Sequence, residues 1–525
     1  MTEPALGRPN LVFGLVGAAG TDLGAIKSQL KAQLASFEYK FVEIKLSQQI
    51  AGFCKIDTKK LPEDERITAL MDGGDTIRTT AKNGDGVTYL AIAAIRALRA
   101  TLEAKVGQSP AGLAFVIDSL KNPEEIKTLS RVYGDNFYVI SVYSKEPDRE
   151  ARLANKIATS CQSTVRQDHK DRAQNVIQQD LKRGNSGLTQ NVENTFPKAD
   201  FFVSVGEGSS GQIKRFVELI FGEPFITPTL PEYSMSLAKT AALRSCDLSR
   251  QVGAAIVNDD GAILSTGCND VPYPGGGMFF EGQHGNDNRD YVIKADPNFS
   301  EISDVFSEIV EAFRGAQLFS HDVEELDDAE IVRRLLHGEW REHMVDARVR
   351  NLIEFGRVVH AEMHALSEAA RFGRAVAGSA LYCTTFPCHI CARHIIASGI
   401  TKVVFIEPYP KSLTKKLYVR EITTDESRGE LAHPVRFEPF VGVAPSLYQK
   451  AFGSRHRKGD SGEIVELKRD SAVPVGASFV VSNPQVEENL SSKVDEVRDE
   501  IHGVNPQKGD NGDDAPDRGP APASA

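Results

Sequence analysis

Residues 360–394 read HAEMHALSEAARFGRAVAGSALYCTTFPCHICARH, and this stretch decides the fold of the C-terminal half of the chain. Its first part is rich in Ala, Leu, Glu and Met, contains no proline and ends at Gly373, which predicts a helix. Residues 379–385 predict a short strand. Cys388 comes directly after a proline and begins a second predicted helix, which ends at Gly399. The two helix N-termini are expected to converge.

Three side chains in this stretch are typical zinc ligands. His360 offers a ring nitrogen, and the C-x-x-C spacing lets the thiolates of Cys388 and Cys391 bind one ion. A catalytic zinc takes three protein ligands and keeps one position for water, whose pKa falls from about 15.7 toward about 7. Glu362, two residues after His360, can carry the protons of that water. The pattern predicts Zn2+ as the cofactor and Glu362 as a catalytic residue.

A closed structural zinc site is the alternative interpretation. Cys383 would supply its fourth ligand, but this cysteine lies inside the predicted strand, where a buried apolar role is expected. A closed site would also leave Glu362 without a role. His364 lies one helical turn from His360, and we expect it to support the site or face solvent rather than bind the ion.

Length and composition set the outer bounds. A chain of 525 residues has room for two or three domains, and 41% hydrophobic with 25% charged residues is ordinary for a globular protein. Seven cysteines are too few for a disulfide framework and favour a reducing cytoplasm. No apolar run reaches the roughly 18–20 residues that span a membrane, so no membrane contact is expected. A net charge of -11 argues against broad binding to nucleic-acid backbone.

Residues 1–222 alternate strand and helix patterns, which predicts an N-terminal three-layer α/β domain. A buried strand at 11–16 leads into a glycine-rich turn that contains Gly17 and Gly20, the usual position of a phosphate-binding loop. The P-loop pattern G-x-x-x-x-G-K-[ST] is not met, because Leu23 stands about where its lysine belongs.

The N-terminal half therefore resembles a nucleotide-kinase-like P-loop domain whose phosphate loop has decayed. We expect it to act in regulation or assembly. Retained binding of a nucleotide at Gly17 and Gly20 is an open alternative, and an active kinase is the least favoured one, because the missing lysine is central to charge stabilisation.

The remaining boundaries follow from composition. Residues 223–235 contain three prolines and predict a domain linker. A second α/β/α domain is expected over 236–482, with a largely helical insertion at 275–357. Residues 483–525 are acidic and end in a Gly/Pro/Ala-rich run, which predicts a disordered tail.

Four motifs carry a resemblance to a known family. They are RSCDLSRQVGAAIV at 244–257, STGCNDVP at 265–272, VVHAEMHAL at 358–366 and TTFPCHICARHIIASGITKVVFIEPYPKS at 384–412. Together they resemble deoxycytidylate deaminases, and the pattern H-x-E with P-C-x-x-C is typical of zinc nucleobase deaminases. With the kinase-like first half, the layout resembles bacterial anti-phage dCTP deaminases. The resemblance implies a cytidine-deaminase-like C-terminal fold with zinc on His360, Cys388 and Cys391.

The same resemblance implies a function and further site residues. Glu362 would be the proton shuttle, Asn269 would contact the sugar or base, and Arg244 and Arg250 are candidate substrate-binding residues. The implied reaction is hydrolysis of dCTP and dCMP to dUTP and dUMP with release of ammonia, which would deplete dCTP in anti-phage defence. A homo-oligomer is expected, and an RNA or protein inhibitor is an open question.

Two alternative functions remain open. A tRNA or single-stranded polynucleotide deaminase would need a basic groove with stacking aromatic residues, against which the net charge and the single tryptophan argue. A catalytically idle regulatory protein would not need the intact His, Glu and two Cys residues.

Two surface features also have two interpretations each. The loop GGGMFFEGQHGNDNRD at 275–290 either folds over the substrate or forms an oligomer contact. Residues 407–412, which include Lys411, and the pair Lys415 and Lys416 follow the last core strand, near the sheet edge where phosphates often bind. A solvated basic helix is the alternative interpretation.

Overall fold

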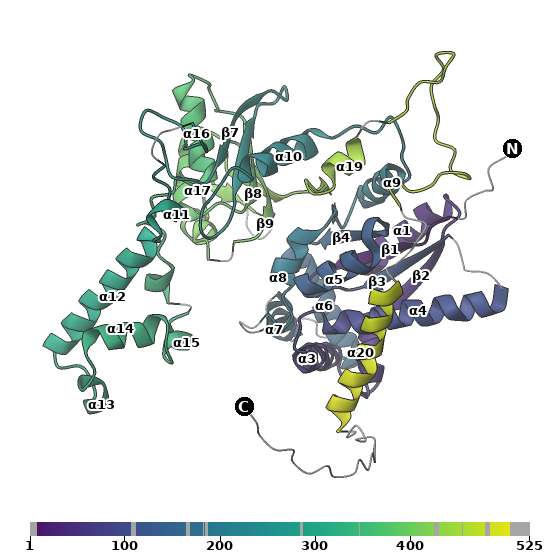
Figure 1. Ribbon diagram of the computed structural model, residues 1–525, viewed down its shortest axis with the longest axis horizontal. Helices are drawn as coiled ribbons and strands as arrows, with labels where there is room; N and C mark the ends of the chain where they lie inside the picture. Colours follow the sequence, from purple (N-terminus) through teal and green to yellow (C-terminus); the bar gives the residue numbers. More distant parts are fainter. Residues whose placement is uncertain are drawn as a thin grey trace, which may run out of the picture.

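The computed structural model describes residues 8–503 except 107–111, 164–168, 182, 184–186, 284–286, 346, 410, 425–429, 454 and 478–483. Two six-stranded sheets organise these residues (Figure 1). Within the described residues, no helix is both long and apolar enough to cross a membrane.

The first sheet has the strand order β12-β5-β4-β1-β3-β2, and all its neighbouring pairs are parallel except β12 with β5. Every residue of its central strand β1 is buried, because helices cover both faces of the sheet. The strands are β1 (Leu11–Val16), β2 (Lys40–Lys45), β3 (Leu113–Asp118), β4 (Phe137–Tyr143), β5 (Phe201–Ser204) and β12 (Gly442–Val443).

Two hydrophobic cores lie on the two faces of this sheet. Successive side chains of β1 point to opposite faces of the sheet. Phe13 belongs to the core that contains Ile26 of α1, and Val12 belongs to the core that contains Ile92 of α4. The three-layer α/β architecture predicted for this half is confirmed. The helices are α1 (Leu23–Ala35), α2 (Leu46–Phe53), α3 (Glu63–Thr80), α4 (Gly86–Val106), α5 (Pro123–Tyr133), η1 (Gly134–Asn136), α6 (Glu146–Ser160), α7 (Lys170–Leu181), α8 (Val192–Thr195), η3 (Phe196–Lys198) and α9 (Ser209–Ile220).

The second sheet has the order β10-β11-β9-β8-β6-β7. Strands β6 and β7 form an antiparallel hairpin, and β8 and β9 run parallel, as a helical crossover requires. Its strands are β6 (Gly253–Val257), β7 (Ile263–Cys268), β8 (Ala380–Thr385), β9 (Lys402–Glu407), β10 (Ile422–Thr423) and β11 (Val435–Pro439). Its main helices are α10 (Leu230–Ala242), α16 (Ala361–Arg371) and α17 (His389–Ala397), with the short α18 (Thr414–Leu417) and α19 (Tyr448–Phe452) nearby in sequence.

The second sheet also lies between helices. Leu381 of β8 packs with Ala365 of α16, whereas Tyr382 shares a core with Met235 of α10. Gly267 on β7 permits a close approach of α16, because a Cβ there would lie 2.3 Å from the Ala361 carbonyl oxygen. The α/β/α sandwich predicted for this half is therefore present, and it holds α16 tightly against the sheet edge.

The insertion forms a small helical unit with a core of its own. This core contains Ile302, Phe306 and Val310 of α12 together with Ile331 and Leu336 of α14. In Figure 1 these helices extend away from the second sheet as an arm. The elements are α11 (Asp290–Ile293), α12 (Pro297–Gly315), α13 (His321–Glu324), α14 (Asp328–Leu336), α15 (Arg341–Met344) and η4 (Arg348–Asn351).

The prediction of a linker over 223–235 is wrong at its C-terminal end, since α10 begins at Leu230. Thr229 is the N-cap and forms a capping box with Glu232, so the proline at 231 starts a helix rather than marking a linker. Glu232 also accepts hydrogen bonds from Arg215 at 2.7 Å and from the Val443 amide at 2.8 Å. This buried carboxylate joins the two halves.

The prediction of disorder from residue 483 onward is wrong for α20 (Pro484–His502), which lies along α4 (Figure 1). Val494 and Val497 are buried, and Glu487 forms a salt bridge with Arg99 of α4. An acidic segment folds here because another part of the chain supplies the apolar and basic surface that it lacks alone. Residues 504–525 of the predicted tail lie outside the described residues.

Candidate active site

The zinc-ligand candidates stand at the starts of two helices. His360 is the N-cap residue of α16, and Cys388 is the N-cap residue of α17, with Cys391 in its first turn. The Cys388 sulfur accepts a hydrogen bond from the Cys391 amide at 3.4 Å. Partial positive charge at both helix N-termini favours thiolates at this place. The predicted convergence of the two helix starts is confirmed.

The ligand atoms are close enough to share one ion. Nδ1 of His360 lies 3.2 Å from the Cys388 sulfur and 3.3 Å from the Cys391 sulfur. A tetrahedral zinc with bonds of about 2.3 Å to sulfur and about 2.0 Å to nitrogen would separate nitrogen and sulfur by roughly 3.5 Å. The three residues therefore fit zinc, and they are the one metal-ligand group among the described residues.

Cys383 and His364, the two further candidate ligands, lie outside the group formed by His360, Cys388 and Cys391. Cys383 is fully buried in β8 and is not part of the ligand group. His364 is also buried, and its Nδ1 lies 3.0 Å from the backbone of Cys268 on β7. Burial lowers the pKa of this imidazole. His364 thus attaches α16 to the sheet, and three ligands leave a coordination position for water.

Mutual contacts shift the pKa values of the ligand side chains in different directions. A hydrogen bond from Cys391 and the neighbouring His360 lower the pKa of the Cys388 thiol to about 4. A hydrogen bond to Cys388 raises the pKa of His360 to about 9. The site accordingly holds a thiolate at neutral pH, which is the form of cysteine that binds metal.

Glu362 lies in the first turn of α16 and is only 4% exposed. It lines the same cavity as His360 and Cys388. Burial is the main cause that raises the pKa of its carboxyl group. A buried carboxyl with a raised pKa beside a metal site can both accept and return a proton.

The cavity at these residues has a volume of about 420 Å³, within the usual size range of small-ligand sites. Besides residues 360–362, Cys388 and Asn269, its wall comes from five other parts of the chain. They are the loop before β6 at 247–252, the two ends of the insertion at 290–298 and 351–358, the end of β8 at 385–386, and the loop after β9 at 409–411.

Asn269 lines this cavity, but its side-chain amide is engaged with the loop before β6. Its Oδ1 accepts a hydrogen bond from the Val252 amide at 2.7 Å, and its Nδ2 donates to the Arg250 carbonyl at 2.8 Å. Asn269 therefore positions the cavity wall, and a direct contact with sugar or base stays a prediction.

Of the two arginines predicted to bind substrate, Arg250 lines the cavity and Arg244 does not. Arg250 lines the cavity, with its guanidinium 5.8 Å from the ring centre of Tyr409. Arg244 does not line it, and its guanidinium lies 3.7 Å from the ring centre of Phe280. Among the described residues of the loop at 275–290, Asp290 is the one that lines this cavity.

In the N-terminal half, a carboxylate of the protein itself binds the backbone of the predicted phosphate loop. The Ala19 amide, between Gly17 and Gly20, donates to the carboxylate of Asp180 at 2.6 Å. Lys121 donates to the Gly17 carbonyl and to Asp180, each at 2.8 Å. Asp180 lies on α7 and is 2% exposed. A buried carboxylate thus occupies a loop that would otherwise face a phosphate, and sequence spacing gave no signal for this distant partner.

We expect Asp180→Ala to lower the free energy of unfolding by about 1–3 kcal/mol, because Lys121 and the Ala19 amide lose their acceptor. Chemical denaturation of the full chain measures the change. Asp171→Ala, an exposed position on the same helix, serves as the control and should stay within about 0.5 kcal/mol. Equal stability of both variants would contradict a structural role for the Asp180 carboxylate.

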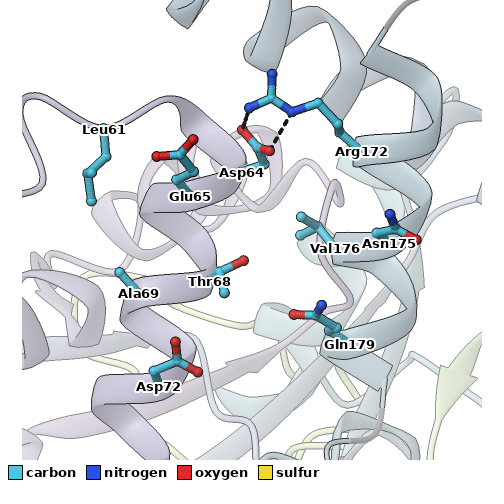
Figure 2. Close-up of a pocket in the computed structure, with 10 residues that line it drawn as sticks. All are labelled: Leu61, Asp64, Glu65, Thr68, Ala69, Asp72, Arg172, Asn175, Val176 and Gln179. Atoms are coloured by element: carbon cyan, nitrogen blue, oxygen red, sulfur yellow. Dashed lines mark hydrogen bonds and ion pairs between the residues drawn. The ribbon is translucent and has the colours of Figure 1, made fainter.

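A second cavity of about 450 Å³ lies between α3 and α7 (Figure 2). Asp64 and Arg172 form an ion pair at 2.6 Å at one end of it, and Asp72 lies toward the other end. Its wall contains no imidazole or thiol, so it offers none of the zinc-binding groups found at His360.

The fold and site of the second half define a class of protein: an α/β/α domain with a three-ligand zinc site and a buried carboxyl group. Residues 228–407 match the family model of the cytidine and deoxycytidylate deaminase zinc-binding region. The C-terminal part of the chain therefore contains a zinc-binding domain of the deaminase type, and the prediction of zinc is confirmed.

Curated relatives match parts of the chain. Deoxycytidylate deaminases of the Enterobacteria phages T2 and T4 are each 44% identical over 54 residues, which cover 10% of this chain and 29% and 28% of those proteins. The ComE operon protein 2 of Bacillus subtilis is 40% identical over 98 residues, 17% of this chain and 52% of that protein. The chain thus spans about half or less of the length of these relatives.

Among solved structures, the dCMP deaminase of cyanophage S-TIM5 in complex with dCMP and dUMP has 20% sequence identity and a TM-score of 0.23. The match covers 41% of this chain and 99% of that chain. The same enzyme in its apo form gives 19% identity and a TM-score of 0.21.

Proposed function

We propose that this protein is a zinc-dependent hydrolytic deaminase that converts dCTP and dCMP to dUTP and dUMP with release of ammonia. The observation that carries the proposal is the meeting of His360, Cys388, Cys391 and buried Glu362 at one cavity, within a segment that matches the deaminase zinc-binding region. The relatives that are deoxycytidylate deaminases support a deoxycytidine nucleotide as the substrate.

The chain's own residues account for the proton transfers of this reaction. Zinc, when bound, would lower the pKa of a coordinated water toward about 7. Glu362 would take a proton at its carboxylate and deliver it to the pyrimidine ring nitrogen, and a second transfer through the same group would release the amino group as ammonia. The water oxygen replaces the amino nitrogen at C4, so atoms and charge balance.

We propose a regulatory or assembly role for the N-terminal half. The Asp180 carboxylate inside the phosphate loop supports this proposal over phosphoryl transfer, because a phosphate group would meet a negative charge there. Anti-phage depletion of dCTP, assembly into a homo-oligomer and control by an RNA or protein inhibitor belong to the same proposal.

A substrate panel tests the proposed reaction. Zinc-loaded protein is incubated with dCTP, dCMP, CTP and single-stranded DNA, and ammonia and uracil-containing products are quantified. We expect turnover of dCTP and dCMP. Turnover of DNA alone would favour a polynucleotide deaminase, and no turnover of any compound would favour an idle regulatory protein; either result overturns the proposal.

A further inference from the structure

The charged side chains in the wall of the 420 Å³ cavity differ in whether they have a partner. Asp290 forms an ion pair with Arg357 at 3.1 Å. Asp296 caps α12 by accepting hydrogen bonds from backbone amides, of which the nearest is at 3.0 Å. Asp247 likewise accepts from the amide and hydroxyl of Ser249. Asp290 thus has a cationic partner, and Asp296 and Asp247 have hydrogen-bond donors within the protein.

The two cationic side chains of the wall have no carboxylate partner. Within the described part of the chain, Arg250 contacts the Tyr409 ring and Lys411 contacts an amide oxygen, and neither forms a salt bridge. Arg250 lies beside the Tyr409 ring, and the Lys411 ammonium donates to the neutral Oδ1 of Asn351 at 2.5 Å. Two exposed cations without a carboxylate partner in one cavity wall can bind a ligand that carries a negatively charged group.

Asn351 holds Lys411 in place through an oriented amide. Its Nδ2 donates to the carbonyl of Ala347 at 2.9 Å and to that of Val345 at 3.2 Å. These two bonds fix which side of the amide is the acceptor, so Oδ1 faces Lys411. The insertion thereby positions a lysine that belongs to the loop after β9.

The residues of the cavity wall divide into an exposed group and a buried group. Arg250 and Lys411 are exposed, whereas Glu362 and Thr385 are buried. Thr385 is 6% exposed and lines the cavity, and its hydroxyl has no hydrogen-bond partner among the described residues. This hydroxyl is therefore available to a polar group of a ligand in the cavity.

We propose that Lys411, positioned by Asn351 of the insertion, is a substrate-binding residue that acts with Arg250 on the phosphate end of a nucleotide. The base then lies toward the buried end, near Thr385 and the zinc ligands. This inference rests on the proposed function for the identity of the base. It assigns the insertion a part in substrate selection, because the cavity wall is incomplete without residues 351–358.

Equilibrium binding tests the role of Lys411. Zinc-loaded full-length Glu362→Gln protein, with and without Lys411→Met, is titrated with dUMP and with deoxyuridine by calorimetry. Loss of a charge-assisted hydrogen bond to phosphate should weaken dUMP binding by roughly 10- to 100-fold. Deoxyuridine, which has no phosphate, should change by less than about twofold. Lys416→Met, at an exposed position in α18, is the matched control and should leave both affinities unchanged.

Steady-state kinetics separates positioning by Asn351 from a general structural effect. In the protein with intact Glu362, Asn351→Ala should raise the KM for dCMP and leave kcat and the KM for deoxycytidine unchanged. Asn351→Asp should raise the KM for dCMP further, since its carboxylate would compete with phosphate for Lys411.

Equal losses for nucleotide and nucleoside, or no loss in Lys411→Met, would overturn the inference. The binding experiment distinguishes this failure from failure of the proposed function. A protein that deaminates nothing but binds dUMP through Lys411 would overturn the reaction and keep the phosphate contact. If the protein deaminates dCMP and Lys411→Met leaves the KM for dCMP unchanged, the reaction stands and the phosphate contact is overturned.

Discussion

Glu362→Gln is expected to reduce deamination of dCTP and dCMP by about 100- to 10,000-fold, the range that general acid–base groups contribute. Glutamine keeps the shape of the side chain in the first turn of α16 but cannot take a proton from water. Ammonia release measures the activity, and elemental analysis of the same sample measures zinc. Zinc content should stay at the wild-type level, because Glu362 is not one of the three ligands.

Glu368→Gln is the matched control for this experiment. Glu368 lies on the same helix, forms an ion pair with Arg371 at 2.7 Å and does not line the cavity. Its replacement should change activity by less than about twofold, as expected for a surface pair. Near-wild-type activity of Glu362→Gln would contradict the proton-shuttle role, and loss of zinc in that variant would make Glu362 a ligand instead.

Cys388→Ser is expected to remove both zinc and activity. Cys388 carries the thiolate at the start of α17, and a serine hydroxyl stays protonated at neutral pH and binds zinc poorly. Replacement of residues that only support metal ligands lowers metal affinity by about 10- to 100-fold, so loss of a ligand should exceed about 100-fold. Competition with a zinc chelator measures the affinity, and far-ultraviolet circular dichroism of the full chain verifies folding.

Cys383→Ala provides the comparison that separates the open from the closed zinc site. Cys383 is as buried as the ligand cysteines but lies in β8 outside the ligand group. The variant should keep one zinc per chain, with a modest loss of stability from the missing sulfur. Zinc loss in Cys383→Ala comparable to that in Cys388→Ser would establish a closed four-ligand site and refute hydrolysis at this metal.

Local sequence signals were sufficient for much of the C-terminal half. Residues 379–385 predicted a strand, and β8 covers Ala380–Thr385. The C-x-x-C spacing and the helix starts predicted the zinc ligands, because the two cysteines lie on one helix turn and His360 and Cys388 are both N-cap residues. Only the pairing of the cysteines is local, since His360 lies 28 residues from Cys388 in sequence and meets it through the packing of α16 with α17.

Partners that composition does not report produced the errors. The proline at 231 predicted a linker, although Thr229 and Glu232 on either side of it form a local capping box that starts a helix, and Arg215 of α9 binds Glu232. The acidic composition of 484–502 predicted disorder, yet α20 packs on α4. In the second case a distant surface supplied the stabilising contacts.

The amino-acid sequence alone determined the chemistry of the metal centre: an imidazole, two thiols and a carboxyl group in the pattern H-x-E with P-C-x-x-C. Only the tertiary structure decided what surrounds that centre. Arg250, Asn351 and Lys411 line one cavity, whereas Arg244 lies outside it. Asp180 enters the phosphate loop from a helix, 161 residues beyond Ala19 in sequence. Such arrangements depend on how helices and sheets pack across long sequence distances, and no short-range pattern encodes that packing.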